Sequence, residues 1–77
     1  MPVIVITGAS QGIGRSIAES FSKLADCRLA LISRNVSRLL EVANTCRENG
    51  AEAETFRCDV TDEEQVKATA KAILEHY

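Results

Sequence analysis

Hydrophobic residues along the chain follow two alternating spacings, which predict three strands and three helices. Continuous apolar runs occur at residues 3–6 and 29–32, and residues 53–58 form a weaker run. Short unbroken runs are typical of parallel strands buried on both faces. After each run, apolar residues recur at the spacing of a helix with one apolar face. These positions are Ile13, Ile17, Ala18, Phe21 and Leu24, then Val36, Leu39, Leu40, Ala43 and Cys46, and finally Val66, Ala70, Ile73, Leu74 and Tyr77.

Polar residues at the boundaries predict where the helices begin and end. Asn35 is a predicted N-cap, because its side chain can accept a hydrogen bond from a free N–H of the next turn. Asn49-Gly50 predicts the end of that helix, since glycine readily adopts the left-handed conformation found there. Residues 61–64 read Thr-Asp-Glu-Glu, which has the form of a capping box beginning at Thr61. We expect the turn before the second strand at Ala25-Asp26.

The order of these elements predicts an α/β fold. Strands that alternate with helices form βαβ units around a parallel sheet. Because such crossovers are right-handed, two in succession give the strand order 3-2-1. We therefore expect residues 1–77 to form the N-terminal part, βαβαβα, of a single Rossmann-like doubly wound domain.

Composition excludes several classes of function. A chain of 77 residues with a formal net charge of −2 shows no basic surface for nucleic acid or an anionic membrane. Its longest apolar run is too short to span a bilayer. The three cysteines, Cys27, Cys46 and Cys58, contain no C-x-x-C pair, and His76 is the only histidine. We therefore expect no metal site, and reduced thiols in a cytoplasmic protein.

Glycines are concentrated where the first strand meets the first helix. Gly8 can form the tight turn, Gly12 can admit a diphosphate to the backbone, and Gly14 can let the helix pack close to the strand. The helix N-terminus supplies free N–H groups and positive potential for such an anion. Ser10 and Arg15 can add a hydroxyl and a charge. A glycine loop that serves only as a turn is the alternative, whereas a P-loop is excluded because no G-K-[ST] follows.

Three segments together resemble one family. TGASQGIG at residues 7–14 is similar to the T-G-x-x-x-G-x-G motif of short-chain dehydrogenases/reductases, and CDVTD at 58–62 resembles their D-[VL]-[ST]-[DN] segment. LISRN at 31–35 lies between them, at the end of the second strand. The resemblance implies a Rossmann-like oxidoreductase that uses NAD(H) or NADP(H) to interconvert small carbonyl and alcohol compounds. It also implies a homodimer or homotetramer.

The end of the second strand favours NADP(H) over NAD(H). A carboxylate there would bind the ribose 2′-hydroxyl of NAD, whereas an arginine accommodates the 2′-phosphate of NADP. This chain has Ser33 and Arg34, and a guanidinium is a good phosphate ligand. Gln11 departs from the resemblance, because many NADP-preferring members have Arg or Lys at that position. The alternative for Arg34 is a solvated loop residue.

The resemblance also assigns residues to the adenine and the diphosphate. It implies that the side chain of Asp59 and the backbone N–H of Val60 contact the adenine amino group, and that the backbone N–H of Ile13 faces the diphosphate. Alternatively, Asp59 closes a turn and the Ile13 side chain belongs to the core. The complete set of predicted cofactor-binding residues is Gly8, Ser10, Gln11, Gly12, Ile13, Gly14, Ser33, Arg34, Asn35, Asp59 and Val60.

The catalytic residues implied by the resemblance do not occur among these 77 residues. The family's Asn, Ser, Tyr and Lys lie in later N-N-A-G and Y-x-x-x-K motifs. Tyr77 is the last residue, and we expect it to be the last apolar contact of its helix. We therefore expect the N-terminal portion of a longer oxidoreductase. A truncated, non-catalytic nucleotide-binding or interaction module is the alternative, whereas the glycine spacing argues against an epimerase-like nucleotide binder.

Overall fold

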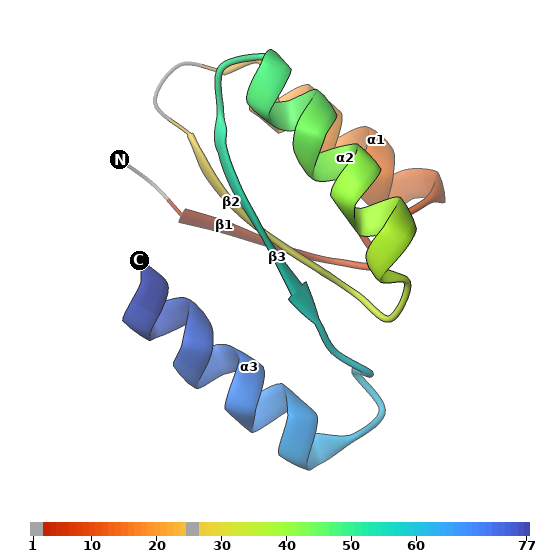
Figure 1. Ribbon diagram of the computed structural model, residues 1–77, viewed down its shortest axis with the longest axis vertical. Coiled ribbons are helices and arrows are strands. Elements are labelled where there is room, and N and C mark those ends of the chain that lie inside the picture. Colours follow the sequence, from red (N-terminus) through yellow and green to blue (C-terminus); the bar gives the residue numbers. More distant parts are fainter. Residues whose placement is uncertain (1–2, 25–26) are drawn as a thin grey trace.

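Three strands and three helices alternate along the chain, as the hydrophobic pattern predicted (Figure 1). The computed structural model describes residues 3–24 and 27–77, so the turn predicted at 25–26 lies outside the described residues. The elements are β1 (Val3–Thr7), α1 (Gly12–Ser22), β2 (Arg28–Ser33), α2 (Val36–Glu48), β3 (Glu52–Arg57) and α3 (Glu63–His76). Among the described residues, none of these helices is long and apolar enough to cross a membrane.

The strands form one parallel sheet with β2 in the centre, which confirms the predicted strand order 3-2-1. Val5 of β1 pairs with Ala30 of β2, and Ala30 pairs in turn with Glu54 of β3. Helices α1 and α2 cover one face of the sheet, and α3 covers the other (Figure 1). This arrangement is one half of a Rossmann-like doubly wound fold.

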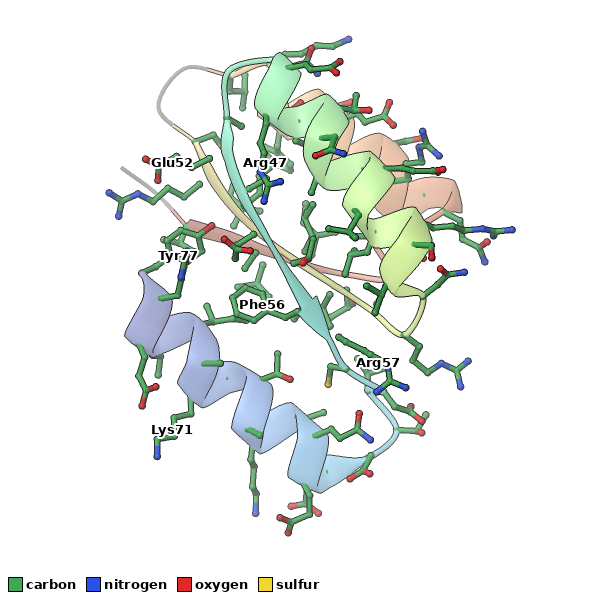
Figure 2. All side chains as sticks on the ribbon, in the orientation of Figure 1. Arg47, Glu52, Phe56, Arg57, Lys71 and Tyr77 are labelled. Atoms are coloured by element: carbon green, nitrogen blue, oxygen red, sulfur yellow. The ribbon has the colours of Figure 1, made fainter. Side chains whose placement is uncertain are left out.

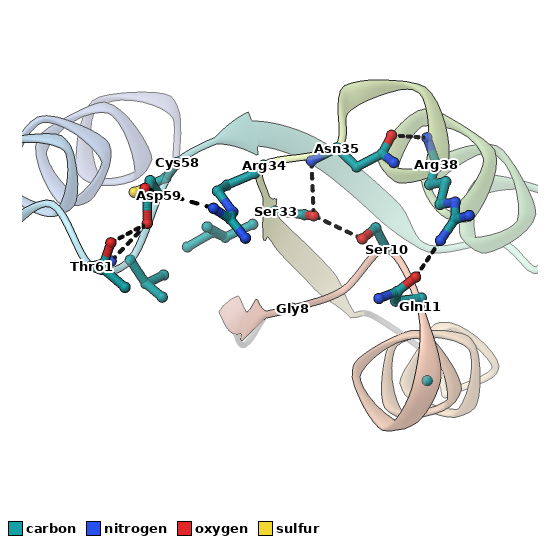
Figure 3. Close-up of a pocket in the computed structure, with 13 residues that line it drawn as sticks. Gly8, Ser10, Gln11, Ser33, Arg34, Asn35, Arg38, Cys58, Asp59 and Thr61 are labelled. Atoms are coloured by element: carbon teal, nitrogen blue, oxygen red, sulfur yellow. Dashed lines mark hydrogen bonds and ion pairs between the residues drawn. The ribbon is translucent and has the colours of Figure 1, made fainter.

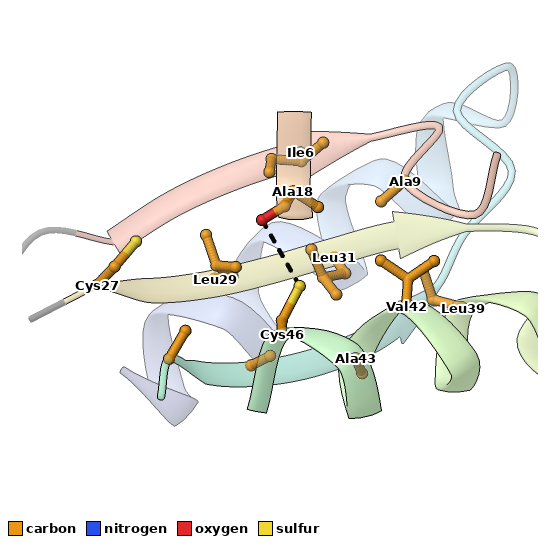
Figure 4. Packing of buried hydrophobic residues seen from close by; sticks show 12 residues of the cluster. Ile6, Ala9, Ala18, Cys27, Leu29, Leu31, Leu39, Val42, Ala43 and Cys46 are labelled. Carbon is orange, nitrogen blue, oxygen red and sulfur yellow. Dashed lines mark hydrogen bonds between the residues drawn. The ribbon is translucent and has the colours of Figure 1, made fainter. Parts of the chain in front are cut away.

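The core lies on both faces of β2, because alternate residues of a strand point to opposite sides. Leu29 and Leu31 pack with buried residues of α1 and α2 (Figure 4), whereas Ala30 and Ile32 pack with Ile73 of α3. All three cysteines are free and buried. Tyr77 packs against the apolar cluster between β2 and α3, which confirms its predicted apolar contact. Its hydroxyl also donates to the Leu29 carbonyl at 2.9 Å.

The prediction that β1 is buried on both faces is wrong. Ile6 is buried, but Val5 is 52% exposed, because β1 is an edge of the described sheet and α3 lies over β2 and β3. The predicted inner face of α3 is wrong in part for the same reason. Ile73 is buried, whereas Leu74 is 80% exposed and lines an apolar groove beside β1.

The predicted apolar faces of the first two helices are likewise only partly covered. In α1, Ala18 is buried, whereas Leu24 just beyond the helix is exposed. In α2, Leu40 is exposed and Val42, which the pattern did not select, is fully buried. Helix spacing therefore identified an apolar stripe but misplaced its centre on α2 by part of a turn.

Two of the three predicted helix boundaries are confirmed. The Asn35 side chain caps α2 by accepting a hydrogen bond from the Arg38 N–H at 3.1 Å. Gly50 has a φ of +98° just after α2, in the left-handed region that favours glycine.

The capping box predicted at Thr61 is wrong by one residue. Asp62 is the N-cap of α3, and its Oδ1 accepts from the N–H groups of Glu64 and Gln65 at 3.0 and 3.3 Å. The Thr61 hydroxyl instead donates to Asp59 at 2.6 Å, within the preceding turn. Aspartate caps a helix as well as threonine does, so the motif allowed both alignments.

Candidate functional site

A cavity of about 680 Å³ lies at the carboxyl edge of the sheet, where the loops after β1, β2 and β3 meet (Figure 3). Open α/β sheets bind ligands at this edge. Most of the predicted cofactor-binding residues line the cavity, although they are far apart in sequence. They are Gly8, Ser10, Gln11, Gly12, Ser33, Arg34, Asn35, Asp59 and Val60.

Geometry requires glycine at three positions in and just after the turn that joins β1 to α1 (the glycine turn, residues 8–11). Gly8 and Gly12 have φ angles of +63° and +61°, which L side chains rarely adopt. A Cβ built on either residue would meet no heavy atom within 4 Å, so the space beside their backbones is open. At Gly14 a Cβ would lie 2.2 Å from the Gly8 carbonyl oxygen. Gly14 therefore permits close packing of α1 against the turn, whereas Gly8 and Gly12 set its path.

The N-terminus of α1 presents positive potential beside this turn. Gln11 is the N-cap residue, but its side chain caps no N–H group, and the first turn of α1 contains no acidic residue. The first hydrogen bond of the helix runs from the Arg15 N–H to the Gln11 carbonyl at 3.4 Å. The preceding N–H groups of the first turn are therefore left for an anion, which the helix dipole also favours.

Hydrogen bonds hold the loops after β1 and β2 against each other. The Ser33 hydroxyl donates to Ser10 Oγ at 2.8 Å and accepts from the Asn35 N–H at 3.2 Å. The Ala9 N–H donates to the Ile32 carbonyl at 3.1 Å. Ser10 is only 6% exposed, so its contact with Ser33 is a buried link that holds the glycine turn beside the end of β2.

Two arginines lie over the cavity, and sequence reasoning identified only one of them. The Arg34 side chain is 76% exposed, and its Nη1 lies 3.9 Å from Asp59 Oδ2. The Arg38 guanidinium donates to Gln11 Oε1 and so connects α2 to the glycine turn. Arg38 lies in the first turn of α2, which Asn35 caps, and Arg34 precedes that cap. The available signal was the position of Arg38 in the first turn of the helix that follows β2, because the N-terminus of that helix lies at the same edge of the sheet as Arg34.

Asp59 forms the third side of the site and also closes a turn, as the alternative for this residue predicted. Its Oδ1 accepts from the Thr61 N–H at 3.0 Å and from the Thr61 hydroxyl at 2.6 Å. These bonds, helped by Arg34, hold the pKa of the Asp59 carboxyl below its usual range. The carboxylate is therefore an acceptor aimed at the cavity, while its contact with an adenine stays a prediction.

Replacing Thr61 by valine should raise the pKa of Asp59 toward its usual range, because a hydrogen bond to the charged form is lost. The folded-state pKa is depressed, so this carboxyl stabilises the fold above its unfolded-state pKa and loses that contribution as the pH falls through the folded pKa. An NMR titration of the Asp59 carboxyl carbon measures the change. Thr45→Val, which removes a hydroxyl from α2, is the control. An unchanged titration in Thr61→Val would contradict the assigned cause.

Two predicted residues do not line the cavity. Gly14 lies beneath the turn, and Ile13 lines an adjoining apolar depression with Ile17 and Phe21. The Ile13 side chain is strongly exposed, so the alternative that it belongs to the core is wrong. Its backbone N–H contact with a diphosphate stays a prediction. The cavity also contains residues that the sequence reasoning did not select: Ile32, Arg38, Cys58 and Thr61.

Comparison with known proteins gives one consistent result. A family model described as short chain dehydrogenase matches residues 2–77. Short-chain dehydrogenase/reductase 3 from Homo sapiens is 38% identical to this chain over 94% of it and 24% of the human protein.

Two solved structures show the same fold with different cofactors. An alcohol dehydrogenase from the archaeon Thermococcus sibiricus, complexed with 5-hydroxy-NADP, has a TM-score of 0.92 and 40% identity over 100% of this chain and 33% of its own. A short-chain dehydrogenase/reductase from Burkholderia phymatum, in complex with NAD, has a TM-score of 0.87 and 41% identity over 95% of this chain and 26% of its own. The chain therefore spans a third or less of the length of these relatives.

Proposed function

Because the chain belongs to the short-chain dehydrogenase/reductase family, we propose that it forms the nucleotide-binding part of an NADP(H)-dependent oxidoreductase. In this proposal, the whole protein interconverts a small carbonyl compound and its alcohol. The bound nicotinamide would supply or accept the hydride, and the loops after β1, β2 and β3 would hold the adenosine end of the cofactor. We further propose that the protein is cytoplasmic and forms a homodimer or homotetramer. Light scattering of the purified protein would test the oligomeric state.

This proposal is carried by one observation: the glycine turn and Arg34 line the same cavity. The uncapped N-terminus of α1, beside Gly8 and Gly12, would hold the diphosphate. Ser33 and Arg34 at the end of β2 would face the adenosine ribose, where NAD-binding proteins place a carboxylate. A guanidinium and a hydroxyl at this place suit a 2′-phosphate better than a 2′-hydroxyl.

The adenine would lie toward the loop after β3. Asp59 offers a carboxylate acceptor and Val60 a backbone N–H, and both residues line the cavity. The Asp59 backbone is held in place, because its N–H donates to Gln65 Oε1 at 2.9 Å. These groups match an adenine amino group and an adjacent ring nitrogen in hydrogen-bonding character.

Calorimetric titration of the full-length protein with NADPH and NADH tests the proposal. We expect NADPH to bind more tightly, and we expect Gly12→Val to abolish binding of both dinucleotides. Valine both opposes the positive φ and fills the open space beside the backbone. Ser20→Ala, an exposed change in the same helix, is the control.

The outcomes separate the competing functions. A folded protein that binds neither dinucleotide would overturn the proposal. Tight NADPH binding without turnover of any compound in a panel of small aldehydes and ketones would favour a non-catalytic nucleotide-binding module. Equal affinity for the two dinucleotides would retain the family's activity and refute the preference for NADP(H).

A further inference from the structure

The contact between Arg38 and Gln11 joins α2 to the glycine turn on the side of the candidate site away from Asp59 (Figure 3). Arg38 comes from the first turn of α2, and Gln11 from the glycine turn before α1. Both residues line the cavity that also contains Arg34 and Ser33. The contact therefore fixes a guanidinium at the mouth of the site, although both side chains lie on the surface.

The electrostatic environments of the two arginines differ. Arg34 lies within ion-pair distance of Asp59, whose carboxylate offsets part of its charge. Within residues 3–24 and 27–77, Arg38 forms no ion pair, and its side-chain partner is the neutral amide of Gln11. A neutral acceptor positions a guanidinium without neutralising it. Arg38 thus offers a full positive charge, with further N–H donors free for a ligand.

We propose that Arg38, positioned by Gln11, is a second phosphate-binding cation that, together with Arg34, determines the preference for a 2′-phosphorylated dinucleotide. This inference rests on the proposed function. Phosphate monoesters carry up to two negative charges and several acceptor oxygens, so two guanidinium groups bind them better than one. Arg38 supplies from α2 a cation that the glycine turn lacks at Gln11, and Gln11 acts as a positioning residue.

The proposal explains how a chain with glutamine at position 11 can still select NADP(H). A lysine at position 11 would carry its charge at the end of a flexible chain. Here the charge comes from a residue whose backbone is fixed in a helix, and whose N–H is bound by the Asn35 cap at 3.1 Å. The glutamine amide then limits where the guanidinium can lie, which favours bidentate contact with a phosphate.

Ligand pairs that differ only in the 2′-phosphate test the proposal in the full-length protein. Dissociation constants are measured for NADPH and NADH, and for 2′,5′-ADP and 5′-ADP, in wild type, Arg38→Ala and Arg38→Lys. We expect Arg38→Ala to weaken the 2′-phosphorylated ligands about tenfold or more and the others less than about twofold. Arg38→Lys keeps the charge and should recover part of the affinity.

Arg57→Ala is the matched control, because Arg57 is an exposed arginine at the end of β3 that does not line the cavity (Figure 2). It should change all four dissociation constants alike and only slightly. Gln11→Ala should weaken NADPH several-fold by releasing Arg38. The double variant Gln11→Lys/Arg38→Ala should recover NADPH affinity relative to Arg38→Ala, since it returns a cation to the site.

The proposal would be overturned if the ratio of the NADH to the NADPH dissociation constant were the same in Arg38→Ala and Arg57→Ala. That result would leave the proposed function intact. Equal weakening of NADPH and NADH in Arg38→Ala, with no recovery in Arg38→Lys, would also overturn the proposal and would indicate a role in folding. If wild type binds neither dinucleotide, the proposed function fails, and this inference fails with it.

Discussion

Replacing Gly14 by alanine should destabilise the protein, although alanine in a helix interior normally stabilises it by about 1 kcal/mol relative to glycine. The added Cβ would lie 2.2 Å from the Gly8 carbonyl oxygen and 3.1 Å from that of Thr7. These are backbone atoms, so relief requires a shift of the glycine turn or of α1. Overpacking of this kind costs about 1–3 kcal/mol, and the expected change in unfolding free energy is of that order.

The same substitution should weaken NADPH binding, because the displaced turn is the one we assign to the diphosphate. Thermal unfolding and calorimetric titration of the full-length protein measure the two effects. Ser16→Ala and Ser20→Ala are matched controls, since both are exposed positions of α1, and each should change stability by no more than about 0.5 kcal/mol. A Gly14→Ala protein as stable as wild type, with unchanged NADPH affinity, would refute the close packing at Gly14.

The fold was predictable from the sequence because it depends on local periodicity. Continuous runs at β1 and β2 and helical spacing after them determine the order of the elements, and the handedness of crossovers then determines the sheet. Burial was less predictable, since it depends on which neighbours are present. Val5 and Leu74 have the residue types of a core, yet both are exposed because α3 and β1 leave a groove between them.

The candidate site was predictable where the backbone itself carries the signal. Gly8, Gly12 and Gly14 meet geometric requirements that other residues satisfy poorly, so their spacing could be interpreted directly. Arg38 was missed because its role depends on a side chain crossing from α2 to Gln11, and no local pattern encodes that contact. The cap of α3 was misplaced by one residue for a related reason, since Thr61 bonds to Asp59 instead.

Replacing Arg34 by aspartate should change the cofactor preference more than Arg34→Ala or Arg38→Ala does. It removes a cation from the end of β2 and places a carboxylate where it would repel a 2′-phosphate and accept from a 2′-hydroxyl. Loss of the charge-assisted contact alone is worth about 1.5–3 kcal/mol, or about a ten- to hundredfold weakening of NADPH. NADH affinity should fall little or rise, so the preference between the cofactors should reverse.

Three variants separate the causes of this reversal. Arg34→Ala removes the cation without adding an anion, so it should weaken NADPH without improving NADH. Arg57→Asp makes the same change of charge outside the cavity and should alter both affinities only slightly. Because Arg34 lies 3.9 Å from Asp59, the aspartate variant should also raise the pKa of Asp59, which an NMR titration would show. Equal effects of Arg34→Asp on NADPH and NADH would instead mean that Arg34 is a solvated loop residue, leaving Arg38 as the remaining candidate for the 2′-phosphate.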